Sequence, residues 1–385
     1  MTSLRWALAA PTLLFCYPLA ASQNEPVESQ GNEAVSSSGL AETFAQTGFD
    51  AFTEQLETDP NVPAFGIGVL GCEQVAVHAG GIIRIDGAAR IGPGAVFNIG
   101  SNAKSVLATA AGRMHDRGEL SLDATIGGIW PEIAEKHPDK AEITLAQLFS
   151  HRSGLPAFNT GAELEGVPDF SGEPAAVRKA AAEWFLSQPL AKPIGEETLY
   201  SNAGYVVVGY LLELASGKSL ANLLDSEVFR PLGITADLGE PRNMAGSQPF
   251  GHYVSEGQVV ANTSDDPPIP PFLEAAGNVS FGPLAYARYL QAHLCALRGD
   301  SDFLSPNTAR RIHTPEIAGG SGLGWGITKM GEANVSFHIG GTGDFTTYAA
   351  LSPDQNRAVF VMMSVGGDPA SVGQLWLIEA IRPPK

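Results

Sequence analysis

A serine and a lysine three residues apart, Ser101 and Lys104, follow a short apolar run that ends at Gly100. Residues i and i+3 lie on one face of a helix, so the Lys104 amine can reach the Ser101 hydroxyl. Unpaired N–H groups at a helix N-terminus also favour negative charge developing on the serine. The pair predicts an activated serine nucleophile, although in isolation a capping serine beside a solvated lysine is the more common arrangement.

Two further groups of residues could belong to the same site. Tyr200 and Asn202 stand two residues apart at the start of an expected helix, where an extended loop would turn both toward one cleft. An asparagine cap with the tyrosine packed beneath it is the alternative. His338 ends an expected strand beside Gly340 and Gly341, which would let a ligand or another backbone approach closely, unless they only form a hairpin turn.

His151 ends another expected helix, over residues 143–155. A histidine at a helix end is more often bonded to a backbone carbonyl than catalytic. We therefore interpret His151 as a structural residue.

The elements that must position these residues follow from hydrophobic periodicity. Strands are expected near both ends of the chain, with helices between them. The expected strands are 63–77, 81–85, 325–327, 335–338, 346–351 and 358–363, and the expected helices are 41–58, 143–155, 206–215, 283–297 and 370–381. Residues 241–283, rich in proline and glycine, are expected to form a loop that borders a binding site.

The segment Gly66–Gly71 satisfies the G-x-G-x-x-G pattern of dinucleotide-binding proteins, with Asp86 downstream. That fingerprint requires a helix to open at the glycines. Residues 72–78 instead continue a strand pattern that Gly80 and Gly81 close within too few residues for a crossover. We therefore reject nucleotide binding.

Composition excludes several function classes. The formal charge is −18, from 41 acidic and 23 basic residues, and no basic patch offsets it, so we expect no nucleic-acid partner. No histidine or cysteine cluster has metal-ligand spacing, and the zinc motif H-E-x-x-H and the nucleophile elbow G-x-S-x-G are both absent from the sequence.

The first 22 residues resemble a secretory signal peptide, with Arg5, the apolar run 6–15 and a small-residue cleavage site at 20–22. The apolar run is too short for a membrane span, and the bulky residue before Cys16 argues against a lipoprotein. We expect a flexible linker over 23–40, a catalytic domain over 41–385, and a periplasmic or secreted location.

Two cysteines, Cys72 and Cys295, remain after signal removal. In an oxidising compartment they could form one disulfide bond. Both lie in apolar runs, which favours two buried free thiols.

Taken in order, Ser101-x-x-Lys104, Tyr200-Ser201-Asn202 and His338-x-Gly340 resemble the motifs of the penicillin-recognising serine hydrolases. The resemblance is closest to the branch of class C β-lactamases, D,D-peptidases, D-aminopeptidases and serine esterases. It extends from about residue 50 to the end and includes the flanking strings His151-x-Ser153-Gly154-Leu155 and Pro231-Leu232-Gly233.

The resemblance implies an α+β fold of the β-lactamase/transpeptidase type. In that fold a mainly antiparallel sheet from both chain ends is flanked by helices, and an all-helical region, here roughly residues 105–300, is inserted. It implies acylation of Ser101, with proton transfer shared by Lys104 and Tyr200, each lowering the pKa of the other. Asn202 would orient Lys104 and the substrate carbonyl, and the amides of Ser101 and Gly341 would form the oxyanion hole.

His338 and Gly340 would complete the substrate-binding strand, but His338 stands where many relatives carry a lysine for a substrate carboxylate. A neutral imidazole holds a carboxylate less firmly than a lysine ammonium does, so the substitution favours ester or D-aminoacyl substrates over penicillins. Ile339 also replaces a small hydroxyl residue and removes one hydrogen-bond donor.

The resemblance therefore predicts an exported serine hydrolase that acts on a small-molecule or peptide substrate, namely an ester, a D-amino-acid amide or peptide, or a β-lactam. It implies neither a metal nor an organic cofactor. The alternative is an inactive binding protein of the same fold that recognises peptide or cell-wall fragments. All catalytic positions are filled, which argues against that alternative.

Overall fold

The computed structural model describes residues 47–265 and 268–383. The predicted signal peptide, the predicted linker and the beginning of the expected helix over 41–58 lie outside the described residues. Within them, no helix combines the length and apolar character needed to cross a membrane.

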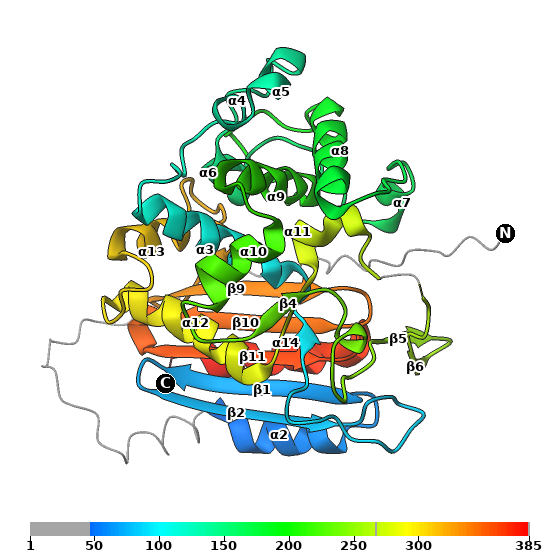
Figure 1. Ribbon diagram of the computed structural model, residues 1–385. Coiled ribbons are helices and arrows are strands. Elements are labelled where there is room, and N and C mark those ends of the chain that lie inside the picture. The colour runs from blue at the N-terminus through cyan, green and yellow to red at the C-terminus, as the bar shows by residue number, and fades with distance from the viewer. Residues whose placement is uncertain (1–46, 266–267, 384–385) are drawn as a thin grey trace, which may run out of the picture.

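A six-stranded sheet forms the centre of the molecule (Figure 1), and neighbouring strands pair antiparallel in the order β2-β1-β11-β10-β9-β8. Two strands come from the N-terminal part and four from the C-terminal part, as the resemblance implied. Their bounds are β1 Ala64–Gly71, β2 Gln74–Gly81, β8 Gly326–Met330, β9 Ala333–Gly341, β10 Thr346–Ser352 and β11 Arg357–Met363. The α+β fold of the β-lactamase/transpeptidase type is thereby confirmed.

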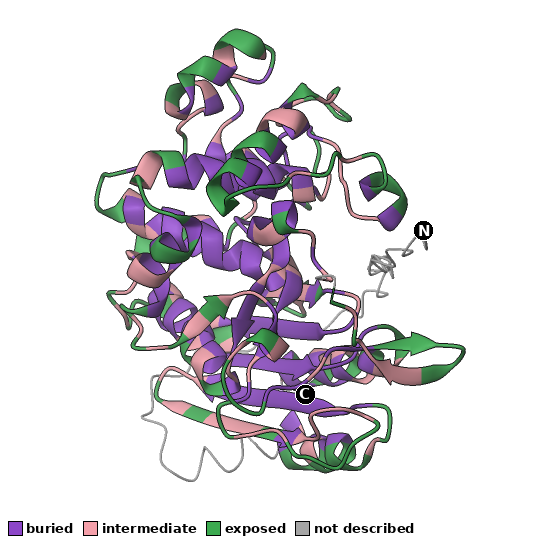
Figure 2. Ribbon diagram, turned by 45° about the vertical axis from the view of Figure 1, so that its right-hand side comes forward, coloured by how far each residue is buried: buried purple, intermediate pink, exposed green. Residues whose placement is uncertain are grey.

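Two apolar layers cover the sheet. On one face, α2 (Phe49–Thr58) packs against α14 (Ser371–Ile381), and the rings of Phe52 and Trp376 stack 5.0 Å apart. On the other face lie α3 (Ala103–Asp116) and α12 (Pro283–Arg298), whose residues form one continuous core with those of the inserted helices. Figure 2 shows this burial concentrated along the sheet and α3.

The N-terminal strands differ from the expected pair. They form a tight hairpin, so the strand predicted over 81–85 is wrong and β2 already ends at Gly81. Gly81 has a φ of +104°, and a Cβ there would lie 2.1 Å from the carbonyl oxygen of Pro63. The glycines of the rejected nucleotide motif lie in β1, where a Cβ on Gly68 would lie 2.2 Å from the Phe360 ring. They serve close packing, and no helix opens there.

Most of the remaining helices lie between β2 and β8. They are α4 Ile126–Ile129, α5 Pro131–Lys136, α6 Leu145–Phe149, α7 Gly161–Leu164, α8 Pro174–Ser187, α9 Asn202–Ser216, α10 Leu220–Leu224, α11 Glu274–Gly277 and α13 Pro306–Ile312. Short helical turns are η1 Gly100–Asn102, η2 Asp225–Phe229, η3 Pro241–Asn243 and η4 Pro271–Leu273, with η5 Pro353–Gln355 and η6 Asp368–Ala370 beyond β8. The helix predicted over 143–155 is therefore much shorter.

Short strands also lie outside the central sheet, and β4 to β7 fall within the region expected to be all-helical. A three-stranded sheet has the order β3-β7-β4, and β5 and β6 form a separate hairpin. Their bounds are β3 Phe97–Asn98, β4 Ala236–Leu238, β5 His252–Ser255, β6 Gln258–Ala261 and β7 Val279–Phe281. The loop expected over 241–283 thus contains a hairpin, because Glu256 and Gly257 both take the positive φ values that a two-residue hairpin turn requires.

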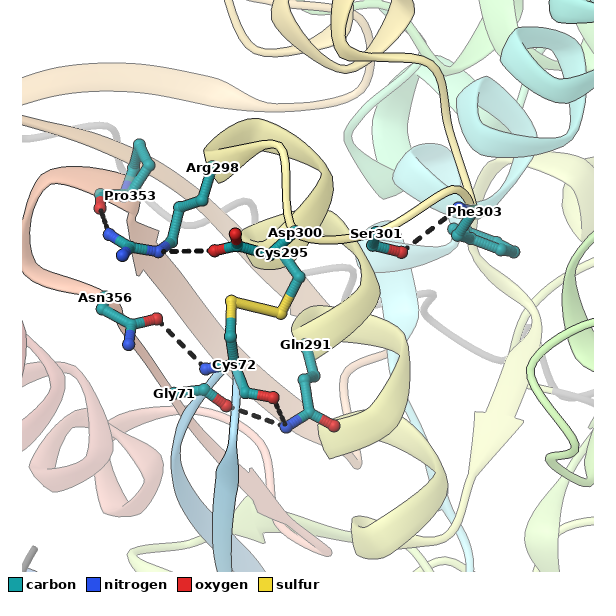
Figure 3. The surroundings of a disulfide bond; sticks show 10 residues. All are labelled: Gly71, Cys72, Gln291, Cys295, Arg298, Asp300, Ser301, Phe303, Pro353 and Asn356. Carbon is teal, nitrogen blue, oxygen red and sulfur yellow. Dashed lines mark hydrogen bonds and ion pairs between the residues drawn. A yellow bond between two sulfur atoms is a disulfide. The ribbon is translucent and has the colours of Figure 1, made fainter. Parts of the chain in front are cut away.

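Cys72 and Cys295 form a disulfide bond, so the expectation of two free thiols is wrong (Figure 3). The β1–β2 turn lies against the last turns of α12, and the two Cα atoms are 5.4 Å apart. Gln291 of α12 reinforces this contact by donating hydrogen bonds to the carbonyl oxygens of Gly71 and Cys72, at 2.8 and 3.0 Å. Only the tertiary packing brings the two sulfurs together.

This disulfide closes a loop of 223 residues, so removing it frees much chain entropy in the unfolded state. We expect the double variant C72S/C295S to lose about 3–5 kcal/mol of unfolding free energy in urea denaturation. Dithiothreitol should lower the stability of the wild type to the same level and leave the variant unchanged. An equal response of both proteins to the reductant would contradict the assignment.

Candidate active site

The predicted nucleophile, Ser101, lies in the short turn η1 at the N-terminus of α3. Asn98 shapes this turn because its Oδ1 accepts a hydrogen bond from the Gly100 amide at 2.8 Å. Gly100 itself has a φ of +51°, and a Cβ there would lie 2.5 Å from the Gly341 amide nitrogen. The turn therefore requires glycine at position 100 and holds Ser101 directly against the end of β9.

Asn102, which the sequence reasoning missed, ties the nucleophile turn to its surroundings. Its buried Nδ2 donates to the carbonyl oxygens of Ile99 and Thr347, at 3.1 and 3.2 Å, and its Oδ1 accepts from the hydroxyl of Tyr286 at 2.9 Å. Thr347 pairs with Gly340 across β10 and β9. Asn102, the residue that follows the nucleophile, is thus joined through β10 to β9, the strand that carries Gly340 and Gly341.

Lys104 lies one helical turn beyond Ser101, as predicted, and is completely buried. Its Nζ donates to Ser101 Oγ at 2.9 Å and to the carbonyl oxygen of Ala276 at 2.5 Å. No carboxylate of the described residues forms an ion pair with it. Burial without an opposite charge holds the pKa of Lys104 well below its usual value, so the amine favours its neutral, basic form.

Tyr200 lies in the same region. Lys104 Nζ is 5.0 Å from the centre of its ring. Burial raises the pKa of Tyr200, and the influence of the nearby Ser101 side chain only partly opposes this shift. The prediction that the lysine and the tyrosine lower each other's pKa is therefore wrong for the tyrosine, which keeps its proton.

Asn202 is the first residue of α9 and enters the same region. Its Nδ2 donates to the carbonyl oxygen of Phe158 at 3.1 Å, and its Oδ1 is buried without a partner among the described residues. No hydrogen bond joins it to Lys104 in the described structure. The free oxygen can accept an N–H group of a substrate, so its binding role stays a prediction.

The amides of Ser101 and Gly341 lie close together. A Cβ on Gly340 would lie 2.9 Å from the Ser101 nitrogen and 2.0 Å from the Ile99 carbonyl oxygen, so only glycine permits this approach. The register of β8 with β9 ends at Phe337, which leaves residues 338–341 without a β8 partner. Backbone amides beyond that point can serve a substrate oxyanion.

His338 lies on this same stretch, which pairs with β10 but not with β8, and it is 7% exposed. Its Nδ1 lies 3.0 Å from the carbonyl oxygen of Ile339. Burial, with a smaller contribution from Lys104, lowers the pKa of His338 to about 3. The imidazole is therefore neutral at physiological pH and offers no fixed positive charge to a substrate.

His151 also belongs to this region, contrary to its interpretation as a histidine bonded to a carbonyl. It takes a φ of +58°, its Nδ1 accepts the Ser201 amide at 3.1 Å, and its ring lies 4.3 Å from that of Tyr200. Burial holds its pKa well below the usual value. The flanking string His151-x-Ser153-Gly154-Leu155 was the only sequence signal that could have placed it here.

The described residues therefore bring Ser101, Lys104 and Tyr200 together, with the amide of Gly341 beside them. Such an arrangement can transfer a proton from an alcohol to an amine and stabilise an oxyanion. Within 47–265 and 268–383, no group of three or more histidine, cysteine or acidic residues could hold a metal ion.

Replacing His151 by phenylalanine isolates the pH dependence of one buried neutral imidazole. In the wild type the unfolded chain binds a proton below about pH 6.5 and the folded chain does not, so the imidazole lowers stability as the pH falls. The unfolding free energy of wild type minus that of His151→Phe should fall by about 2 kcal/mol between pH 7 and pH 5. Urea denaturation at both pH values measures it, and a pH-independent difference would refute a buried neutral His151.

The chain is similar in sequence to several curated proteins. The chain is 26% identical over 236 residues to Unguisins hydrolase ungD' of Aspergillus campestris, covering 57% of this chain and 42% of the relative. It is 26% identical over 292 residues to the D-alanyl-D-alanine-carboxypeptidase/endopeptidase AmpH of Escherichia coli K12, covering 70% and 71%. The first curated relatives are matched over only about half of their own length, between 42% and 58%.

A solved structure shares the fold. The D-amino acid amidase from Ochrobactrum anthropi SV3 superposes with a TM-score of 0.68 at 19% identity, covering 86% of this chain and 98% of that one. The family model described as Beta-lactamase matches residues 49–381. Because that model spans nearly all of the described residues, the chain belongs to the beta-lactamase family.

Proposed function

We propose that this protein is an exported serine hydrolase that forms an acyl-enzyme on Ser101 and acts on uncharged or cationic acyl substrates, such as esters and D-amino-acid amides. One observation carries the proposal. The Lys104 amine lies 2.9 Å from the Ser101 hydroxyl and is buried without a carboxylate partner, which leaves it able to accept the serine proton.

In the proposed reaction, neutral Lys104 takes the proton of Ser101 as Oγ attacks the substrate carbonyl carbon. The amides of Ser101 and Gly341 stabilise the negative oxygen that forms. The Lys104 ammonium then returns the proton to the leaving group, either directly or through the Tyr200 hydroxyl, which stays protonated. A water molecule releases the acyl group by the same steps, with Lys104 again the base.

The charge around the site supports the substrate class. His338 is neutral, with a pKa lowered to about 3, and the whole chain carries a formal charge of −18. An anionic substrate would therefore meet repulsion at long range, and the neutral His338 would offer it no positive charge. The unpartnered Oδ1 of Asn202 suits a substrate that donates an N–H group.

Export is supported by the disulfide bond, because such bonds persist in oxidising compartments. It also follows from the predicted signal peptide over residues 1–22. We therefore propose a periplasmic or secreted location.

A fluorescent alkyl phosphonate tests the nucleophile. We expect the native protein to be labelled at one site and to hydrolyse p-nitrophenyl acetate, and Ser101→Ala to lose labelling and at least 10³-fold of the activity. Ser153→Ala is a matched control, because this serine is buried beside the first turn of α9 and has no place in the proposed reaction. Unlabelled native protein would favour a binding protein of the same fold, and equal labelling of Ser101→Ala would exclude Ser101 as the nucleophile.

The variant His338→Lys tests the substrate class, because it adds a cation on the strand beside the proposed oxyanion hole. We expect kcat/KM for an ester with a free carboxylate to rise about tenfold relative to its methyl-ester analogue. His338→Gln, which adds no charge, should leave that ratio unchanged. A wild type that already prefers the carboxylate substrate would contradict the proposed class.

A further inference from the structure

A chain of buried hydrogen bonds outside the proposed reaction runs from the central sheet to α3. Ser336 Oγ lies 2.8 Å from His313 Nδ1, and His313 Nε2 lies 2.9 Å from His293 Nδ1. His293 Nε2 lies 2.8 Å from Thr109 Oγ1 in α3. These four side chains are all at most 8% exposed, and Trp325 covers both imidazoles with ring distances of 5.6 and 5.0 Å.

The available protons orient the chain in one direction. The Thr109 hydroxyl donates to the Ser105 carbonyl oxygen at 2.7 Å, so it accepts from His293 Nε2–H. His293 Nδ1 then accepts from His313 Nε2–H, and His313 Nδ1 accepts from the Ser336 hydroxyl. Each imidazole donates once and accepts once, which requires both to be neutral and in the same tautomer. Burial lowers the pKa of His293 to about 3 and also lowers that of His313, in agreement with this geometry.

The far end of the chain reaches the nucleophile turn. The chain continues from Thr109 to Ser105, because the Thr109 hydroxyl donates to the Ser105 carbonyl oxygen. The Tyr289 hydroxyl supports the same residue by donating to Ser105 Oγ at 2.8 Å. Ser105 Oγ in turn donates to the Asn102 carbonyl oxygen at 2.7 Å. The network therefore ends on the residue that follows Ser101.

The near end lies on the strand that carries the rest of the site. Alternate residues of a strand share a face, so Ser336, His338 and Gly340 of β9 all point to the same side of the sheet. Val335, Phe337 and Ile339 occupy the opposite face, in the apolar layer with α14. The position of Ser336 therefore affects the position of the β9 segment that carries His338 and the Gly341 amide.

We propose that His293 and His313 are positioning residues. Their hydrogen bonds, in which each donor points from Ser336 toward Thr109, hold α3 against the oxyanion-hole end of β9. Because α3 carries Lys104 and follows directly after Ser101, the chain positions both residues. This inference rests on the proposed function. The donors of an oxyanion hole must be placed accurately around the developing negative charge. A looser contact between β9 and α3 therefore slows the chemical step more than it weakens substrate binding.

Ser336→Ala removes the first donor of the chain without adding bulk. We expect kcat for p-nitrophenyl acetate to fall about three- to tenfold with KM changed less than twofold, and Ser336→Thr to recover most of the loss. Ser352→Ala is the matched control, because Ser352 is a completely buried serine of β10 whose hydroxyl has no partner among the described residues. Unchanged kcat in Ser336→Ala, or an equal loss in Ser352→Ala, would overturn the proposal.

Nitrogen-15 NMR of the histidine side chains tests the chain independently of activity. In the wild type, both His293 and His313 should be neutral with the proton on Nε2 from pH 7 down to pH 5, and Ser336→Ala should shift the His313 Nδ1 resonance. Protonation of either ring in that range, or an Nδ1–H tautomer, would overturn the proposal. If the wild type shows the expected tautomers but no hydrolysis or phosphonate labelling, the proposed function fails while the hydrogen-bond chain itself stands.

Discussion

The burial of one amine without an opposite charge is the constraint on which the rest of this site depends. Lys104 is completely buried, and its hydrogen-bond partners are the Ser101 hydroxyl and a backbone carbonyl. An ammonium in that position would lose its hydration with no carboxylate to compensate, so the neutral amine is favoured. A lysine that would be solvated on a helix surface becomes a base because the fold removes water from it.

Neighbouring elements keep this unfavourable arrangement in place. The Ala276 carbonyl that accepts from Lys104 belongs to α11, a helix of only one turn. Arg178 of α8 anchors α11 by binding Glu274, and it binds Glu213 of α9 through two hydrogen bonds at 3.0 and 2.6 Å. Three helices are thus joined by one buried guanidinium, which fixes the carbonyl and so the lysine.

The tyrosines contribute a second constraint. Lys104 Nζ lies 5.0 Å from the ring of Tyr200 and 5.3 Å from that of Tyr205, and the ring of His151 packs against both. These rings exclude water from the amine, and burial raises the pKa of the Tyr200 hydroxyl. Burial favours the neutral form of both groups. Lysine becomes charged by gaining a proton and tyrosine by losing one, so the same burial leaves the amine deprotonated and the phenol protonated.

The sequence predicted those parts of the structure that depend on local patterns. The C-terminal strands and the helices over 283–297 and 370–381 follow from periodicity, and β8 to β11, α12 and α14 lie close to the expected ranges. The spacing of Ser101 and Lys104 allowed their contact, because residues three apart lie on one face of a helix, and the two other motifs made that contact the favoured interpretation. By contrast, the β5–β6 hairpin was missed because its Glu-Gly turn lies within a proline-rich stretch that resembles a loop.

What sequence by itself determined here was the order of the motifs and the local geometry of each, since both are carried by residues close together in the chain. The disulfide of Cys72 and Cys295, the place of His151 beside Tyr200, the role of Asn102 and the direction of the Tyr200 pKa were decided by tertiary structure alone. Each depends on residues far apart in sequence, and on how completely their packing excludes water. Burial is a property of the folded chain, so no local pattern of residues specifies it.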